Sequence, residues 1–344
     1  MFRFRSAKSF GFGLILILSW EIPLTLVWSL PVRIDVDQIE LIKKGESIFR
    51  HFCSHCHGSG GEGDGYNAEF LDKDPADFTD TEFMAKRSDQ RLFRVIKGGG
   101  LEVKKSVLMP AFGFTLSEKE IWSVIAYIRS FSGVKIKNIS DMDGKRPQVP
   151  GLEIEKVLEF IKTGLQDQDK INLGEKLFMK KKACLACHVI EDEGGRVGPN
   201  LTRSGWVYPP EWMFFWLHDP QSIKPHTKMV NMGLQINELN ALVTYLMSQK
   251  GGSETIDEWK PYLKGEGNPK NGKKIFFDAD GGANCGRCHK VNDQGGELGP
   301  NLSFIGSART PKFLLESILN PSEVIANDYS TMLILTKSGK LISG

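Results

Sequence analysis

Three five-residue stretches decide how this chain folds: Cys53-Ser54-His55-Cys56-His57, Cys184-Leu185-Ala186-Cys187-His188 and Cys285-Gly286-Arg287-Cys288-His289. Each stretch has two cysteines separated by two residues and followed at once by a histidine. Together they contain all 6 cysteines of the 344-residue chain. Because no thiol is left over for another role, the pattern predicts one chemistry used three times.

The similarity of the three regions extends beyond the cysteines, which indicates an internal repeat. Upstream, a glycine opens a predicted short helix that carries an apolar pair: Gly45 with Ile48 and Phe49, Gly174 with Leu177 and Phe178, Gly272 with Ile275 and Phe276. Downstream, the second and third regions share the turns Gly198-Pro199-Asn200-Leu201 and Gly299-Pro300-Asn301-Leu302, and the first has a glycine-rich stretch over 58–65. We therefore predict three tandem modules.

Helical patterns complete the modules. We predict helices over residues 89–97, 211–218 and 311–319, the last with Pro311 in its first turn after Thr310. A closing helix is expected in the first two modules, begun by a capping box of Ser117 and Glu120 and by a cap at Asn237. In the third module, residues 333–335 and 341–342 flank a turn and predict a short β-hairpin. The expected fold class is all-α.

Composition places the boundaries of the modules. Residues 1–31 combine Arg3, Arg5 and Lys8 with apolar runs interrupted by Glu21. This is typical of an export signal peptide, with an uncleaved membrane anchor as the alternative. The remaining boundaries that we expect are module 1 at 38–133, a linker at 134–165 with a short helix over 154–161, module 2 at 166–250, a linker at 251–265, and module 3 at 266–344.

The charge of the chain is nearly balanced. Lys and Arg number 44 and Asp and Glu number 42, for a formal net charge of +2. No basic face or tail stands out, so we expect no nucleic-acid partner. With 40% hydrophobic residues, the chain can form packed cores.

The repeated Cys-x-x-Cys-His pattern is the attachment motif of haem c, in which two thiols add to the porphyrin vinyl groups and the histidine binds the iron. We therefore expect three covalently bound haem c groups, with His57, His188 and His289 as iron ligands. The covalent links would be made by Cys53, Cys56, Cys184, Cys187, Cys285 and Cys288. A zinc site is the alternative, but zinc needs four ligands, and its sites usually pair two Cys-x-x-Cys elements.

The second axial ligand of each iron decides between electron transfer and chemistry, because a methionine thioether raises the potential and blocks substrates. In module 1 we assign Met109, which precedes Pro110 on a loop before the closing helix; Met84 is the alternative. Either methionine would otherwise be a flexible core filler.

In module 2 the expected ligand is Met229, with Met232, His226 and His218 as competitors. In module 3, Met332 is the only methionine after Cys288, and no histidine follows His289. Met332 is the expected ligand there. Alternatively, Met332 is a strand residue whose side chain faces a core. The other reading leaves the third haem with an open position.

At these motifs the chain resembles the class I cytochrome c family, whose modules are small helical folds wrapping one haem between His and Met. Module 1, with Asp74-Pro75-Ala76-Asp77-Phe78 and Met109-Pro110, looks like the haem subunits attached to respiratory oxidases and quinol-oxidising complexes. Module 2, with Lys228-Met229, is similar to modules that accompany membrane cytochrome b. Module 3, with Asn320-Pro321 followed by Tyr329, resembles haem domains near the ends of large bacterial proteins.

These features together predict a three-haem protein that passes single electrons in a bacterial respiratory chain. The expected location is the periplasm or the outer face of the cytoplasmic membrane, with membrane association through residues 10–30. The expected partners are redox proteins, chiefly a membrane quinol-oxidising or terminal complex. The alternative is a haem enzyme, a peroxidase or a nitrogen-oxide reductase, that uses an open haem in module 3. A module that only carries haem is a third reading.

Overall fold

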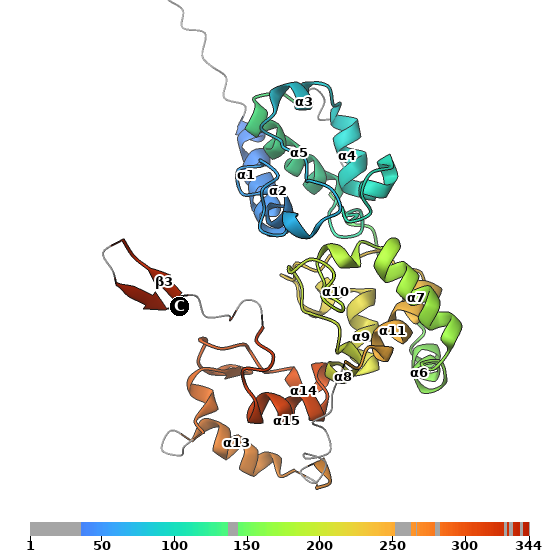
Figure 1. Ribbon diagram of the computed structural model, residues 1–344, viewed down its shortest axis with the longest axis vertical. Coiled ribbons are helices and arrows are strands. Elements are labelled where there is room, and N and C mark those ends of the chain that lie inside the picture. The colour runs from blue at the N-terminus through green and yellow to red at the C-terminus, as the bar shows by residue number, and fades with distance from the viewer. Residues whose placement is uncertain are drawn as a thin grey trace, which may run out of the picture.

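The computed structural model describes residues 36–136, 144–251, 263–265, 267–278, 283–326, 329, 333–337 and 340–343. The predicted export segment and Met332 lie outside these residues. The described part is mostly helical, as predicted, and its strands occur only in short antiparallel pairs. Figure 1 shows the three modules as separate bodies with module 2 in the middle.

Module 1 is held together by the crossing of its first and last helices, α1 and α5 (Figure 1). A Cβ atom built on Gly45 would lie 1.9 Å from the carbonyl oxygen of Ser123 on α5. Gly45 is therefore inside α1, at the crossing point, and our prediction that it opens the helix was wrong. The elements of this module are α1 (Val36–Phe52), α2 (Ser54–His57), η1 (Ala68–Phe70), α3 (Thr81–Ala85), α4 (Asp89–Gly98), η2 (Gly100–Val103) and α5 (Glu118–Ser132).

Module 2 repeats this crossing with α7 and α11. A Cβ atom on Gly174, in the middle of α7, would lie 2.1 Å from the carbonyl oxygen of Ala241. Here too the glycine permits close helix packing and does not begin a helix. The elements are α6 (Ile154–Thr163), α7 (Gln168–Lys180), η3 (Cys184–Ala186), α8 (Ser204–Val207), α9 (Pro210–His218), α10 (Pro220–Ile223) and α11 (Ile236–Ser248).

Of the two helix caps predicted from the sequence, one is confirmed and the other was wrong. The capping box of Ser117 and Glu120 at the start of α5 is confirmed. The predicted cap at Asn237 was wrong, because α11 begins at Ile236, two residues earlier than that cap implies, and Gln235 forms a capping box with Glu238. The helix expected over 154–161 is present as α6, and its Val157 is buried in the core of module 2.

Module 3 has the same first helix, motif turn and following helices as module 2. Its helix α15 begins at Pro311 with Thr310 as the cap, as predicted. The predicted hairpin is present, with Leu333 opposite Ser343. The pair β1–β2 was not predicted. The elements are α13 (Pro269–Phe277), η5 (Cys285–Arg287), β1 (Lys290–Val291), β2 (Gln294–Gly295), α14 (Ile305–Ala308), α15 (Pro311–Leu319), β3 (Leu333–Leu335) and β4 (Leu341–Ser343).

The described residues of module 3 include no helix at the place of α5 and α11. Gly272 corresponds to Gly45 and Gly174, yet a Cβ atom built on it would meet nothing within 4 Å. Gly306 behaves in the same way, whereas its counterpart Gly205 in module 2 packs against Met247 at the end of α11. Among the described residues, none covers the face of α13 that corresponds to the covered face of α1 and α7.

Two sets of contacts connect the modules. Between modules 1 and 2, the main-chain N–H of Asn231 donates to Thr115 Oγ1 over 2.8 Å, and Val230 packs against the core of module 1. Between modules 2 and 3, Arg203 pairs with Glu316, and Phe313 is buried in the core of module 2. Among the described residues, no helix is long and apolar enough to cross a membrane.

Candidate functional site

The histidine of each motif is held by the same kind of hydrogen bond. His57 Nδ1 lies 3.2 Å from the carbonyl oxygen of Ala76, His188 Nδ1 lies 2.9 Å from that of Pro199, and His289 Nδ1 lies 2.9 Å from that of Pro300. A carbonyl oxygen can only accept, so Nδ1 carries the proton and Nε2 keeps its lone pair. This is the tautomer and orientation that an iron-ligating histidine requires.

The Gly-Pro turns of modules 2 and 3 are shaped around the imidazole ring. A Cβ atom on Gly198 would lie 2.5 Å from His188 Cε1, and one on Gly299 would lie 2.7 Å from His289 Cε1. The glycine therefore allows the backbone to lie on the ring, and the following proline supplies the carbonyl that fixes it. In module 1 the ring of Phe78 stacks on His57 instead, with 4.6 Å between centroids.

The cysteines are in the state that attachment of a haem requires. All six thiols are free. Burial raises the pKa of Cys53, Cys184 and Cys187 to about 12, which reflects apolar surroundings. Burial also lowers the pKa of His57 and His188, so both rings stay neutral and available as ligands. Free thiol pairs beside an oriented neutral imidazole in an apolar setting fit covalent haem c.

In module 1 the predicted axial ligand Met109 borders the core that also contains Phe78, the ring stacked on His57. Its carbonyl accepts a hydrogen bond from the N–H of Gly100 over 2.9 Å, which fixes the loop. The alternative, Met84, is on α3 and is fully buried in the same core. Its position is that of a structural core residue, and the half-buried Met109 has the more accessible sulfur.

In module 2, Met229 packs against the same hydrophobic core as Cys184. Its Sδ atom accepts a hydrogen bond from Trp216 Nε1 over 3.1 Å, and its carbonyl accepts one from Gln221 Nε2 over 2.6 Å. Trp216 was missed by the sequence reasoning, and the only signal was the aromatic run in α9. Met232 packs against the same core.

The competing histidines of module 2 lie elsewhere. His226 is exposed, and His218 Nε2 is 2.8 Å from the carbonyl oxygen of Pro150. That hydrogen bond occupies the nitrogen that a ligand would use. The geometry therefore favours Met229 or Met232 over either histidine, and Met229 remains the prediction.

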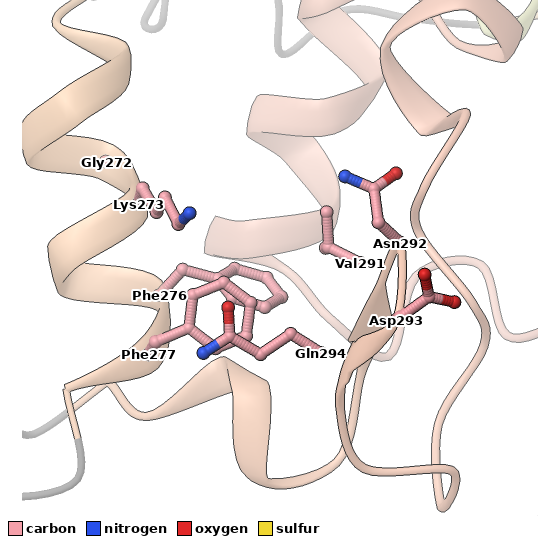
Figure 2. A pocket seen from close by; sticks show the side chains of 8 residues that line it. All are labelled: Gly272, Lys273, Phe276, Phe277, Val291, Asn292, Asp293 and Gln294. Atoms are coloured by element: carbon pink, nitrogen blue, oxygen red, sulfur yellow. The ribbon is translucent and has the colours of Figure 1, made fainter.

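In module 3 a groove of 580 Å³ opens between α13 and the turn of the β1–β2 pair. Figure 2 shows Phe276 and Phe277 on one side and residues 291–294 on the other. Gly272 also lines this groove, so it is the face that α5 and α11 cover in the other modules. Cys285 is exposed. Among the described residues, no cluster of three or more His, Cys, Asp or Glu side chains is arranged to hold a metal ion.

Comparison with known families agrees with this geometry. A family model described as cytochrome c oxidase, cbb3-type, subunit III matches residues 40–128, and the cytochrome c model matches residues 171–250 and 269–334. The chain is a multihaem member of the cytochrome c family. Its cofactor is covalently bound haem c, the group that these domains carry and that the oriented histidines and free cysteines fit.

Two individual proteins are also similar to this cytochrome. Cytochrome c oxidase subunit 2 of Bacillus subtilis is 37% identical over 103 residues, which are 26% of this chain and 29% of that protein. The chain thus spans less than a third of that relative. A chain of the Kuenenia stuttgartiensis reducing HAO-like protein complex is 18% identical, with 60% of this chain and 96% of that chain covered and a TM-score of 0.23.

Proposed function

We propose that the chain holds three haem c groups and passes single electrons between them and a redox partner. The observation that carries this proposal is the repetition of one local geometry. In all three motifs a histidine is locked through Nδ1 by a main-chain carbonyl, and two free cysteines precede it. When bound, each haem supplies a one-electron couple, and the protein supplies ligands, burial and docking surface.

The residues of the chain have distinct tasks in this proposal. The six cysteines hold the cofactor, and His57, His188 and His289 bind iron on one face. Met109, Met229 and Met332 bind the opposite face and keep substrates off. Trp216 donates to the sulfur of Met229 and so draws electron density from it, which tunes the potential of that site.

The partner that we propose is a membrane respiratory complex. Two findings support this: the match of module 1 to a family of oxidase subunits, and the similarity of part of the chain to a cytochrome c oxidase subunit. The proposed location is the periplasm or the outer face of the cytoplasmic membrane, where haem c proteins of respiratory chains exchange electrons. Residues 1–31 would direct export or anchor the chain.

An optical redox titration of the full chain, with carbon monoxide added to the reduced form, tests the proposal. We expect three reversible one-electron transitions and no carbon monoxide binding, because a thioether fills each sixth position. A haem that binds carbon monoxide, together with turnover of peroxide or a nitrogen oxide, would contradict the electron-transfer proposal.

Met109→Ala tests the assignment in module 1. We expect the potential of one haem to fall by a sizeable part of the range of about 0.8 V that axial ligands span, with all haems retained. Met84→Leu is the matched control, because it conserves volume in the core and should leave the potential unchanged. A shift in Met84→Leu but not in Met109→Ala would exchange the two assignments.

A further inference from the structure

Asn67 connects the first haem-binding motif to the second. It is fully buried, which is unusual for an asparagine on a glycine-rich loop. Its Nδ2 atom donates to the carbonyl oxygen of Ala186 over 2.7 Å, and its Oδ1 atom accepts from the N–H of Arg196 over 2.7 Å. Both partners belong to module 2, and Ala186 is inside its Cys-x-x-Cys-His motif.

The same amide also reaches back to its own module. Asn67 Nδ2 lies 3.4 Å from the sulfur of Cys56, and the main-chain N–H of Asn67 donates to the carbonyl oxygen of His55 over 2.8 Å. One side chain therefore contacts the first motif and the second at once. Every polar atom of this amide has a partner, so its place in the interface is fixed on both sides.

The two motifs face each other through this contact. Asn67 Nδ2 lies within hydrogen-bonding distance of both the Cys56 sulfur and the carbonyl oxygen of Ala186, the residue before Cys187. Around the edge of the contact, Arg196 lies over the ring of Phe70 at 4.9 Å, and His51 Nε2 lies 3.3 Å from the carbonyl oxygen of Thr227. The segments that carry Cys56 and Cys187 thus lie next to each other across the interface, joined by Asn67.

Modules 2 and 3 meet in a different way. The contacts described between them lie on and beside α8 and α15: Thr310 Oγ1 donates to the carbonyl oxygen of Trp206 over 2.7 Å, and Arg203 pairs with Glu316. Neither α8 nor α15 contains a motif cysteine or histidine. The direct approach of two motifs is therefore a feature of the first interface.

We infer that Asn67 is a positioning residue for electron transfer between the first and second haem sites. It holds Cys56 and the Ala186–Cys187 segment at a fixed separation, and it provides a path of one weak and one strong hydrogen bond between them. This inference rests on the proposed function. The step moves one electron: one site is oxidised, the other is reduced by the same electron, and no bond or proton changes.

Asn67→Leu in the full haem-loaded chain tests the inference. Leucine keeps the volume but leaves the Ala186 carbonyl and the Arg196 N–H without their partner, which loosens the contact. We expect electron equilibration between the two sites after flash photoreduction to slow about tenfold, equivalent to about 1.4 kcal/mol in the barrier. Magnetic coupling between the two oxidised haems, measured by pulsed electron paramagnetic resonance, should weaken in parallel.

Two further variants separate positioning from general damage. Gly195→Ala disturbs the same contact from module 2, since its Cβ atom would lie 2.2 Å from the Ala186 oxygen and 2.7 Å from Asn67 Oδ1. It should reproduce both effects. Thr115→Val removes the acceptor for Asn231 at the same interface but away from both motifs, and it should change neither readout.

The outcomes distinguish the inference from the proposed function. If the wild-type chain shows no internal electron equilibration, the proposed function fails. If the wild type equilibrates and both Asn67→Leu and Gly195→Ala keep its rate and coupling, Asn67 is only a structural residue and the inference is overturned.

Discussion

In the part of the chain that the structure describes, modules 1 and 2 are closed and module 3 is open, although all three hold the motif histidine in the same way. In the closed modules a glycine of the first helix lies against the backbone of the last helix, and Phe49 and Phe178 pack against Tyr127 and Tyr245. In module 3 the counterpart Phe276 is half-buried, and the preceding Ile275 is 50% exposed. The buried residues of α15, Phe313 and Glu316, face module 2.

This difference separates two parts of the cytochrome c architecture. The turn that orients the histidine depends on about a dozen consecutive residues, and it forms in module 3 without a closed core. The core depends on a helix distant in sequence. Orientation of the histidine is therefore a local property of the motif, whereas burial of the site is a property of the complete module.

The largest loss of stability is expected from a change at Arg129 of module 1. This buried side chain pairs with Asp89 and donates to the carbonyl of Met84 over 2.7 Å, so it joins α3, α4 and α5. Arg129→Ala breaks this buried ion pair with Asp89 and should destabilise module 1 by about 3–5 kcal/mol. Hydrogen–deuterium exchange across α5 measures this loss.

The matched change in module 3 is Lys290→Ala. Its ion pair with Glu297 is solvent-exposed, so the loss should be about 0–1 kcal/mol. Equal effects of Arg129→Ala and Lys290→Ala on their own modules would remove the contrast between closed and open modules.

A smaller effect is expected where module 3 is attached. Glu316 has only 5% of its side chain exposed and accepts from Arg203 Nη2 over 2.9 Å. Arg203→Ala should weaken the docking of α15 by about 1.5–3 kcal/mol, as for other hydrogen bonds to charged groups. Faster amide exchange over Pro311–Leu319, with α5 unchanged, is the expected signature. Unchanged exchange in α15 would show that module 3 holds its helix without module 2.

Opposite effects are expected from one methyl group placed at equivalent positions. Gly174→Ala puts a Cβ atom 2.1 Å from a backbone oxygen and should cost about 1–3 kcal/mol through overpacking. Gly272→Ala meets open space and should stabilise α13 by up to about 1 kcal/mol, because alanine favours helix over glycine. Urea denaturation followed by exchange in α7 and α13 compares them. A clear loss of stability in Gly272→Ala would mean that another helix covers α13 in solution.

Local signals in the sequence predicted local structure well. The caps at Ser117 and Thr310, the helix at 154–161 and the final hairpin are confirmed because each depends on neighbouring residues. The cap at Asn237 was wrong because the helix begins before it. Gln235, a residue type that is less common at this position, is the cap and pairs with Glu238. The assignments of Met109, Met229 and Met332 remain predictions.

Long-range contacts could not be read from the sequence. The sequence predicts that Gly45 and Gly174 begin helices, whereas both lie inside a helix. The neighbouring residues do not distinguish a glycine at a helix crossing from one at a helix boundary. Asn67 meets Ala186 across 119 positions, and Arg129 meets Asp89 across 40. No periodicity or spacing connects residues so far apart, and only the folded chain brings them together.

The most direct test of the account is the haem content of each motif. Mass spectrometry of the intact chain and of its proteolytic peptides would count the haems attached at Cys53–His57, Cys184–His188 and Cys285–His289. The account predicts one haem on each peptide, including the one from the open third module. A third peptide with two free thiols, beside two loaded ones, would contradict it.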